Sequence, residues 1–149
     1  MSTSQAGYLL AIDNGTQSIR AMVFDPDGEL IAKSKVEIEP YVSPQPGWAE
    51  QDVDYFWTSL CDACQQLWPL LDFPKSAIKA VALTTQRATV VNLDDDGEPL
   101  RPAILWLDQR QLDELSSLGP LDLLLRLLRK KDAVDSFRGQ AEANWIAAH

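Results

Sequence analysis

The sequence has few of the residues that bind metals or make disulfides, with two cysteines and a single histidine, His149. A structural zinc site needs about four such ligands, so a zinc-centred fold is excluded. Positive charge is also scarce: 13 Lys and Arg stand against 22 Asp and Glu, giving a formal net charge of −9. Because nucleic acids and anionic lipids bind basic surfaces, we expect neither as the main partner, which still leaves room for a local basic spot that binds a phosphate.

Long hydrophobic runs are absent as well. The start, "MSTSQAGYLL", has no basic stretch ahead of its apolar run, which argues against a signal peptide or an anchor. The stretch "LDLLLRLL" at 121–128 is broken by Asp122 and Arg126, and is far shorter than the roughly 20 residues of a bilayer span. We therefore expect a cytoplasmic protein with no membrane partner. A hydrophobic content of 46% over 149 residues suits a globular domain with a substantial core.

Cys61 and Cys64 form a C-x-x-C pair, for which core packing is the preferred interpretation. A redox pair needs its first thiol near a helix N-terminus, where its pKa is lowered. Both cysteines instead lie inside a helical pattern. We expect them to pack as small apolar side chains.

The first half of the sequence predicts a mixed α/β fold that begins with three antiparallel strands. The apolar run 8–12 is typical of a strand buried on both faces, and the run 19–24 predicts a second strand that pairs with it as a hairpin. The segment "DPDG" at 25–28 suits a type I turn, and the alternation at 32–38 predicts a half-exposed strand at an edge. An irregular, proline-rich connection follows at 39–48.

A crossover helix and further strands are expected next. Apolar residues recur at three- and four-residue steps from Val53 to Trp68, with Asp52 placed as N-cap and Pro69 ending the pattern. Trp57 within this pattern, and Trp48 ahead of it, are expected to pack rather than bind a ligand. Strands are predicted at 78–83 and 89–93, and an extended segment at 103–106.

The C-terminal third predicts helices. Leu112, Leu115 and Leu118 indicate a short helix stopped by Gly119 and Pro120, and residues 121–131 indicate another with a basic C-terminal end. The last segment, "AEANWIAAH", has the pattern of a helix without a stop signal. From this pattern we expect the chain to end within its fold.

The segment "DNGTQS" at 13–18 has the features of a phosphate-binding turn. Gly15 allows the backbone to approach a ligand closely, and Thr16 and Ser18 supply hydroxyls. Asp13 could hold a magnesium ion through water, and Arg20 adds positive charge. A plain β-turn explains the same residues equally well, because Asp, Asn and Gly are common turn residues. The residues alone leave both interpretations open.

Three stretches, in the right order and spacing, resemble the FGGY family of sugar and polyol kinases. "DNGTQSIRAMVFD" resembles the first phosphate motif, D-x-G-T-x-x-x-R. "PGWAEQD" at 46–52 and "LTTQRATVVNLDDDGEPLRPAILWLDQR" at 83–110 resemble two later segments of the family. The resemblance implies a ribonuclease H-like, actin-like ATPase fold, with ATP and Mg²⁺ as cofactors and a sugar or polyol as the small-molecule partner.

The resemblance also implies roles for individual residues. Asp13 corresponds to the acidic residue near magnesium. The residues assigned to the nucleotide phosphates are Gly15, Thr16, Gln17, Ser18 and Arg20. Those assigned to the sugar or polyol are Gln86, Arg87, Ala88, Trp106, Asp108 and Arg110. Where this chain has Arg87-Ala88, glycerol kinases have Arg-Glu and xylulose kinases have Met-His. This chain therefore lacks the carboxylate that accepts hydrogen bonds in glycerol kinases. Its absence argues for a polyol, ketose or sugar acid other than glycerol.

Structural alternatives remain for several of these residues. Arg87 could cover a helix end or pair with an acid on the acidic surface. Asp108 and Arg110 could pair with each other as an exposed bridge, which would contribute only about 0–1 kcal/mol. The segment 50–52 could do no more than start the helix.

The resemblance places residues 7–149 in part of the family's N-terminal, substrate-side domain, with the C-terminal nucleotide domain absent. The family's catalytic base follows the point where this chain stops, so no catalytic residue is assigned and the isolated chain is expected to be inactive. A homodimer of the full-length protein remains open. Two alternatives stand beside the kinase: a non-catalytic sugar-binding or interaction module, and another actin-like ATPase, which explains the first motif only.

Overall fold

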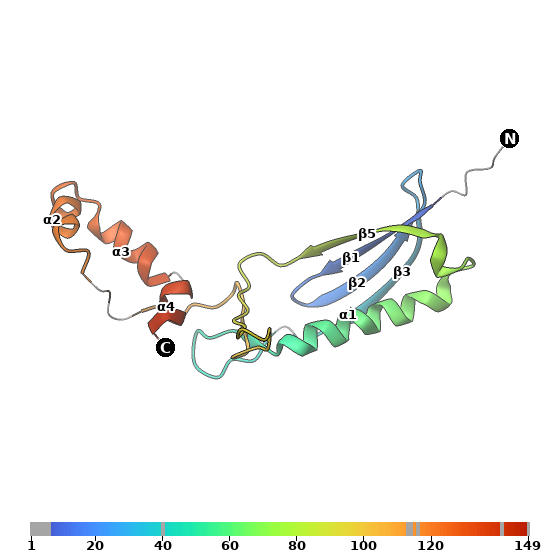
Figure 1. The fold of residues 1–149 in the computed structure, drawn as a ribbon, viewed down its shortest axis with the longest axis horizontal. Helices are drawn as coiled ribbons and strands as arrows, with labels where there is room; N and C mark the ends of the chain where they lie inside the picture. The colour runs from blue at the N-terminus through green and yellow to red at the C-terminus, as the bar shows by residue number, and fades with distance from the viewer. Residues whose placement is uncertain (1–6, 40, 113–114, 116, 141, 149) are drawn as a thin grey trace.

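A four-stranded sheet with one long helix across one face forms the body of the protein (Figure 1). The computed structural model describes residues 7–39, 41–112, 115, 117–140 and 142–148. The strands lie in the order β3-β2-β1-β5, with bounds β1 Tyr8–Asn14, β2 Ser18–Phe24, β3 Leu30–Glu37 and β5 Ile78–Thr85. β1, β2 and β3 pair antiparallel, and β5 pairs parallel with β1. The predicted antiparallel pairing of the first three strands and the edge position of the third are confirmed, whereas the parallel pairing of β5 with β1 was not predicted.

Helix α1, Val53–Leu67, covers the sheet over β2 and β3. It begins at the predicted cap, where the Asp52 Oδ1 atom accepts hydrogen bonds from the backbone N–H groups of Asp54 at 2.7 Å and Tyr55 at 3.2 Å. A 3₁₀ turn at Trp68–Leu70 continues past the predicted end, and another, Lys75–Ala77, precedes β5. The buried core between sheet and helix consists of Leu10, Ile12, Ile19, Ala21, Val23, Ala32, Ile38, Ala63 and Leu67.

The opposite face of the sheet has no covering layer among the residues that the structure describes. The prediction that the first strand is buried on both faces is therefore wrong, because α1 covers one face only. On β5, at the edge beside β1, Val81 is 62% exposed. Trp57 was expected to pack, but it is 66% exposed and does not belong to the buried core.

The two cysteines are free thiols on α1, and Cys64 packs against the core. Burial, followed by the neighbouring Cys61, raises the pKa of the Cys64 thiol. A raised pKa keeps the thiol neutral, which suits packing rather than reactivity. No group of three or more His, Cys, Asp or Glu in the described residues could hold a metal ion. Core packing is thus confirmed for Cys64, whereas Cys61 is half-buried and is not among the residues packed against the core.

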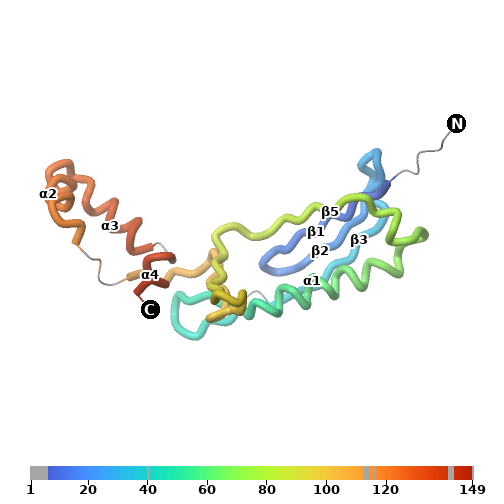
Figure 2. The backbone as a smooth tube through the Cα atoms, in the orientation of Figure 1, coloured from blue at the N-terminus to red at the C-terminus, as the bar shows by residue number. Residues whose placement is uncertain are grey.

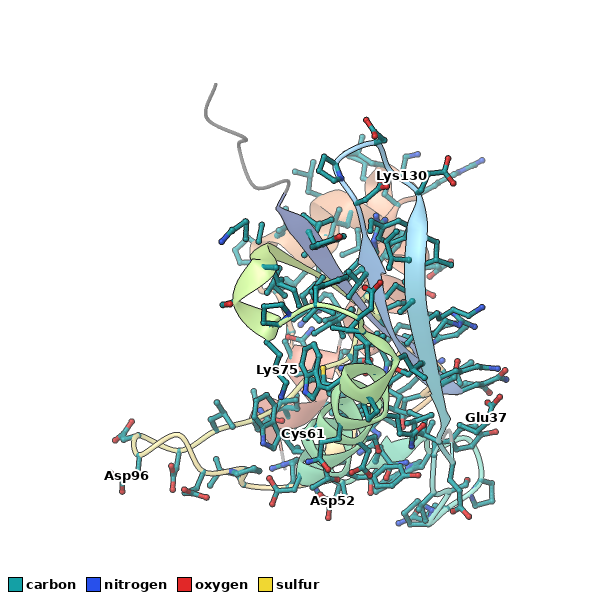
Figure 3. All side chains as sticks on the ribbon, turned by 90° about the vertical axis from the view of Figure 1, so that its right-hand side faces the viewer. Glu37, Asp52, Cys61, Lys75, Asp96 and Lys130 are labelled. Atoms are coloured by element: carbon teal, nitrogen blue, oxygen red, sulfur yellow. The ribbon has the colours of Figure 1, made fainter. Side chains whose placement is uncertain are left out.

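A second, smaller sheet joins β4, Glu50–Gln51, antiparallel to β6, Ala103–Ile104. The strand predicted at 89–93 is wrong: it is reduced to single bridges from Val90 to Ile104 and from Leu93 to Pro99. Pro99 and Pro102 stand in the opposing segment and have no N–H group, so a continuous ladder cannot form. Figure 3 shows Asp96 projecting away from the sheet, on the turn that the bridge from Leu93 to Pro99 closes.

Three helices form a separate cluster at the end of the molecule far from the N-terminus (Figure 2). They are α2 Pro120–Leu127, α3 Lys131–Gln140 and α4 Glu142–Ala148. The helix predicted over 121–131 is too long, because Arg129 has a φ of 54° and breaks it. The predicted final helix is confirmed over α4, and its residues 141 and 149 lie outside the described part.

A short helix was predicted around Leu112, Leu115 and Leu118, but none of these three residues is helical. Residues 113–114 and 116 of the same prediction lie outside the described part. The Asp122 Oδ2 atom instead accepts hydrogen bonds from the Ser117 hydroxyl and the Leu118 N–H, so polar contacts to α2 replace helical ones. None of the helices in the described residues has the length and apolar character needed to cross a membrane.

Candidate active site

The turn between β1 and β2 is tight and tethered to the rest of the sheet. The Gly15 N–H donates to the Ser18 carbonyl at 3.2 Å. A Cβ atom at Gly15 would lie 3.0 Å from that carbonyl oxygen, a contact that favours glycine at this position. The Gln17 carbonyl accepts from the Ile38 N–H at 3.1 Å, which ties the turn to the chain beyond β3. The turn is therefore held in place rather than hanging free.

Asp13 and Arg20 face each other across the first hairpin. The Arg20 Nη1 atom donates to the Asp13 Oδ2 atom at 2.7 Å, and the two side chains are 42% and 33% exposed, respectively. An ion pair this exposed contributes only about 0–1 kcal/mol. A guanidinium has five N–H donors, so this one bond leaves donors on Arg20 for an anionic ligand.

A cavity of about 480 Å³ lies beside the turn and brings together residues far apart in the sequence. We call it the first cavity. Its lining residues are Asp13, Asn14, Gly15, Thr16, Thr85, Gln86, Arg87, Ala88 and Trp106. Because β1 and β5 are parallel neighbours, with Asn14 opposite Thr85, their C-terminal ends meet at one edge of the sheet. The topology thus places the two predicted residue sets side by side.

A chain of hydrogen bonds joins three segments at this cavity. The Trp106 indole Nε1–H donates to the Thr16 hydroxyl at 3.0 Å, and that hydroxyl donates to the Gln86 Oε1 atom at 3.3 Å. The Thr89 hydroxyl donates to the same Gln86 oxygen at 3.1 Å. Trp106 is 52% exposed even though its indole N–H is bonded. Neither the bonding of the indole nor the role of Thr89 follows from the sequence pattern.

Two further features of the first cavity were not predicted. The Asn14 Oδ1 atom is buried without a hydrogen-bond partner, and such an acceptor normally finds a donor. Ala88 has a φ of 55°, in the left-handed region that non-glycine residues adopt rarely and at an energetic cost. An unsatisfied acceptor and a strained backbone are common at binding sites, and both occur among the residues that line this cavity.

A second cavity of about 500 Å³ also lies beside the turn. Gln17, Ser18 and Arg20 line this second cavity and not the first, whereas Gly15, Thr16 and Trp106 line both. Its remaining lining residues are Lys35, Glu37, Tyr41 and Leu107. Lys35 lies directly across from Arg20 on β3. The alternation of the third strand was the signal that could have identified Lys35.

Asp108 and Arg110 line neither cavity, although they were expected to form the same wall as Trp106. They pair with each other as the structural alternative proposed, but the expectation of an exposed bridge is wrong because both side chains are 1% exposed. Arg110 also donates to Glu50 at 2.8 Å, and its guanidinium carbon lies 4.0 Å from the Trp48 ring centroid. The packing role expected for Trp48 is confirmed.

The charges of this buried pair are stabilised by hydrogen bonds. Burial alone would raise the pKa of Asp108, but bonds from the Arg110 side chain and from the N–H groups of Ala49 and Arg110 outweigh it and hold that pKa below its ordinary value. Burial would likewise lower the pKa of Arg110, yet its bonds to Asp108 and Glu50 raise it. Both groups are therefore charged at neutral pH.

The chain is similar to known carbohydrate kinases over nearly its whole length. The model of the FGGY family of carbohydrate kinases, N-terminal domain, matches residues 8–147. A glycerol kinase from Burkholderia cenocepacia (strain HI2424) is 33% identical over 144 residues, which cover 95% of this chain and 29% of that protein. The chain therefore spans less than a third of the length of this relative.

Solved structures agree with this relationship. A xylulose kinase from Rhodospirillum rubrum matches with a TM-score of 0.60 and 26% identity, over 80% of this chain and 23% of the other. A Plasmodium falciparum glycerol kinase, solved with ADP, matches with a TM-score of 0.58 and 30% identity, over 70% of this chain and 21% of the other. On the strength of the family match and the shared fold, the chain belongs to the FGGY family of carbohydrate kinases and corresponds to part of their N-terminal domain.

Proposed function

We propose that this chain is the sugar-binding part of an ATP-dependent carbohydrate kinase, which transfers the γ-phosphoryl group of ATP to a sugar or polyol hydroxyl. The observation that carries the proposal is the first cavity, which joins the Thr16 turn to Arg87. Phosphoryl transfer needs little covalent chemistry from the protein, but it needs the phosphates and the acceptor hydroxyl to be held together. A cavity shared by a phosphate turn and a sugar-binding arginine meets that need.

The phosphate side of the site would use the turn together with Asp13 and Arg20, which lie beside it. Gly15 lets the backbone approach a phosphoryl group, and Arg20 would contact the nucleotide phosphates from the second cavity. The donor set suits Mg²⁺, which commonly binds through one or two carboxylates together with substrate phosphates. Asp13 would hold this ion, near the unpartnered Asn14 oxygen. When bound, the ion would neutralise charge on the phosphates.

The sugar side of the site would use Gln86, Arg87 and Trp106. The Arg87 guanidinium donates hydrogen bonds and cannot accept them, so it favours a substrate that presents hydroxyl or carboxylate oxygens. Ala88 supplies no acceptor where a glycerol kinase would have a carboxylate. The substrate class that fits is therefore a polyol, ketose or sugar acid other than glycerol. We assign no catalytic base and expect residues 1–149 alone to release no ADP.

Calorimetric titration of the chain with glycerol, xylulose and gluconate tests the sugar site. We expect measurable binding of xylulose or gluconate, and at least tenfold weaker binding by Arg87→Ala, because a charge-assisted donor is lost. Arg101→Ala is the matched control, since Arg101 lines neither of the two cavities at the turn. Equal affinities for the two variants would refute the role of Arg87. If the full-length protein binds sugar but no nucleotide, a non-catalytic module is favoured instead.

A further inference from the structure

Asp108 and Arg110 are close in sequence to Trp106, yet they line neither cavity. We propose that these two residues are positioning residues, which hold Trp106 in place so that its indole fixes the Thr16 hydroxyl in the phosphate turn. We call the group Trp48, Glu50, Asp108, Arg110 and Trp145 the Arg110 cluster. The proposal gives the cluster a function at a site that it does not touch.

The side chains of Asp108 and Arg110, at the centre of the Arg110 cluster, are buried and have well-defined partners. The Arg110 Nε and Nη2 atoms donate to the two carboxylate oxygens of Asp108, each at 2.7 Å. The guanidinium carbon lies 4.0 Å from the Trp48 ring centroid and 4.7 Å from that of Trp145, on α4. A planar fork held by two carboxylates and two aromatic rings has little freedom to move.

The cluster joins two segments that are almost 60 residues apart in the sequence. The Ala49 N–H donates to the Asp108 Oδ2 atom at 2.7 Å, and the Leu105 N–H donates to the Ala49 carbonyl at 2.9 Å. The Gln109 N–H donates to the Gly47 carbonyl at 2.8 Å, and Gly47 has a φ of 82°. These bonds lie on both sides of Trp106. The segment that carries the indole is therefore fixed at both ends.

Trp106 lies in a turn that these bonds close. The Asp108 N–H donates to the Leu105 carbonyl at 2.9 Å, so Trp106 and Leu107 occupy its two central positions. Leu105 is fully buried beside Ala49 and anchors one end of the turn, whereas Asp108 anchors the other. A single neutral hydrogen bond contributes less than the entropy cost of ordering a half-exposed side chain and its backbone. The bond from Trp106 to Thr16 thus depends on an ordered turn.

This arrangement also explains why the segments "GWAEQD" and "WLDQR" occur together in this sequence. The first contributes Trp48, Ala49 and Glu50, and the second contributes Trp106, Asp108 and Arg110. A buried ion pair is weak evidence for stability, because apolar side chains of similar volume often stabilise a fold as well. A directional network does provide fixed geometry. The network here fixes the turn that carries Trp106, whose indole contacts Thr16 in the phosphate turn.

Nuclear magnetic resonance on the ¹⁵N-labelled chain tests this proposal without any ligand. We expect Arg110→Lys, which keeps the charge but loses the fork, to weaken the nuclear Overhauser contact between the Trp106 indole N–H and Thr16 at least threefold. Water exchange of that indole hydrogen should become at least fivefold faster. Backbone amide protection in β1, β2 and α1 should be retained, which distinguishes displacement of Trp106 from unfolding.

Arg101→Lys is the matched control. Arg101 also lies over the Trp145 ring, at 5.6 Å, but makes no contact with Asp108 in the described structure, so the Trp106 signals should not change. If Arg110→Lys unfolds the chain, Asp108→Asn takes its place, because the amide oxygen can still accept from Ala49. Unchanged Trp106 signals in a folded variant of either kind would overturn the proposal.

Ligand affinity gives a second test, which rests on the proposed function. Arg110→Lys should weaken binding of the preferred sugar at least threefold although Arg110 lines neither cavity. Absence of sugar binding by the unaltered chain would count against the proposed function and not against the positioning role, which the ligand-free measurement decides. An unchanged affinity together with a displaced indole would overturn the link from Trp106 to the site.

Discussion

Ala88 is strained at the position that follows the proposed sugar-binding arginine. Its φ of 55° costs an L-residue about 1–2 kcal/mol relative to right-handed backbone. The strain sets the path of the chain between β5 and the bridge at Val90, and Gln86, Arg87 and Ala88 all line the first cavity. A backbone that bears such a cost beside a cavity is consistent with a binding role, because strain persists at sites where surrounding contacts hold it.

Replacing Ala88 by glycine should stabilise the protein. Glycine relieves the strain and loses about 0.4–1 kcal/mol through the greater freedom of the unfolded chain. The net gain in the free energy of unfolding is therefore expected to be a few tenths of a kcal/mol to about 1 kcal/mol. Urea denaturation measures it. Ala82→Gly, within β5, is the control and should lose about 0.5–1 kcal/mol; a loss of similar size at Ala88 would show that its backbone is not strained.

Single residues of the site were predictable from the sequence to different degrees. Thr16, Gln86 and Trp106 could be placed at one site because their motifs resemble those of a known family, and the structure brings them together. The burial of Arg110 could not be predicted, because it depends on a contact with Glu50, 60 residues earlier. The φ of Ala88 left no signal either, since alanine is not a residue typical of left-handed backbone.

At the scale of elements, the pairing of β4 with β6 and the Arg110 cluster unite two loops into one unit. The first hairpin, the edge strand and α1 followed from short-range patterns that the structure confirms. The predicted strand at 89–93 and the long helix at 121–131 failed because each depended on a partner or a backbone angle that periodicity does not contain. Local patterns thus predicted the sheet but not the loops around the site.

Acid should destabilise the unit formed by β4, β6 and the Arg110 cluster. Although burial opposes it, hydrogen bonding holds the folded pKa of Asp108 below the value of 3.8 that applies when the chain is unfolded. The stabilisation is therefore complete above about pH 4 and is lost as the pH falls through the folded pKa. Urea denaturation from pH 6 downward should show Asp108→Asn less stable at pH 6, with the difference shrinking below pH 4. A difference that stays constant to pH 2.5 would contradict this account.

At the scale of the whole molecule, the sheet brings two cavities to one turn. Gly15, Thr16 and Trp106 line both, so ligands in the two cavities would share these three contacts although their other lining residues differ. This arrangement follows from the parallel pairing of β1 with β5, which brings the first motif to the end of the strand that precedes Gln86. The sequence predicted the strands but not the pairing of β1 with β5, so both this neighbourhood and the division into two cavities required the structure.

Chemical-shift mapping on the ¹⁵N-labelled chain tests the central claim most directly. Titration with xylulose or gluconate should shift the backbone amides of Thr16, Gln86 and Arg87 together, in one saturable transition, whereas amides on the loop at Asp96 should not move. Saturable shifts that leave Thr16 unmoved, or that cluster away from the turn, would contradict the claim that the phosphate turn and the sugar-binding residues form one site.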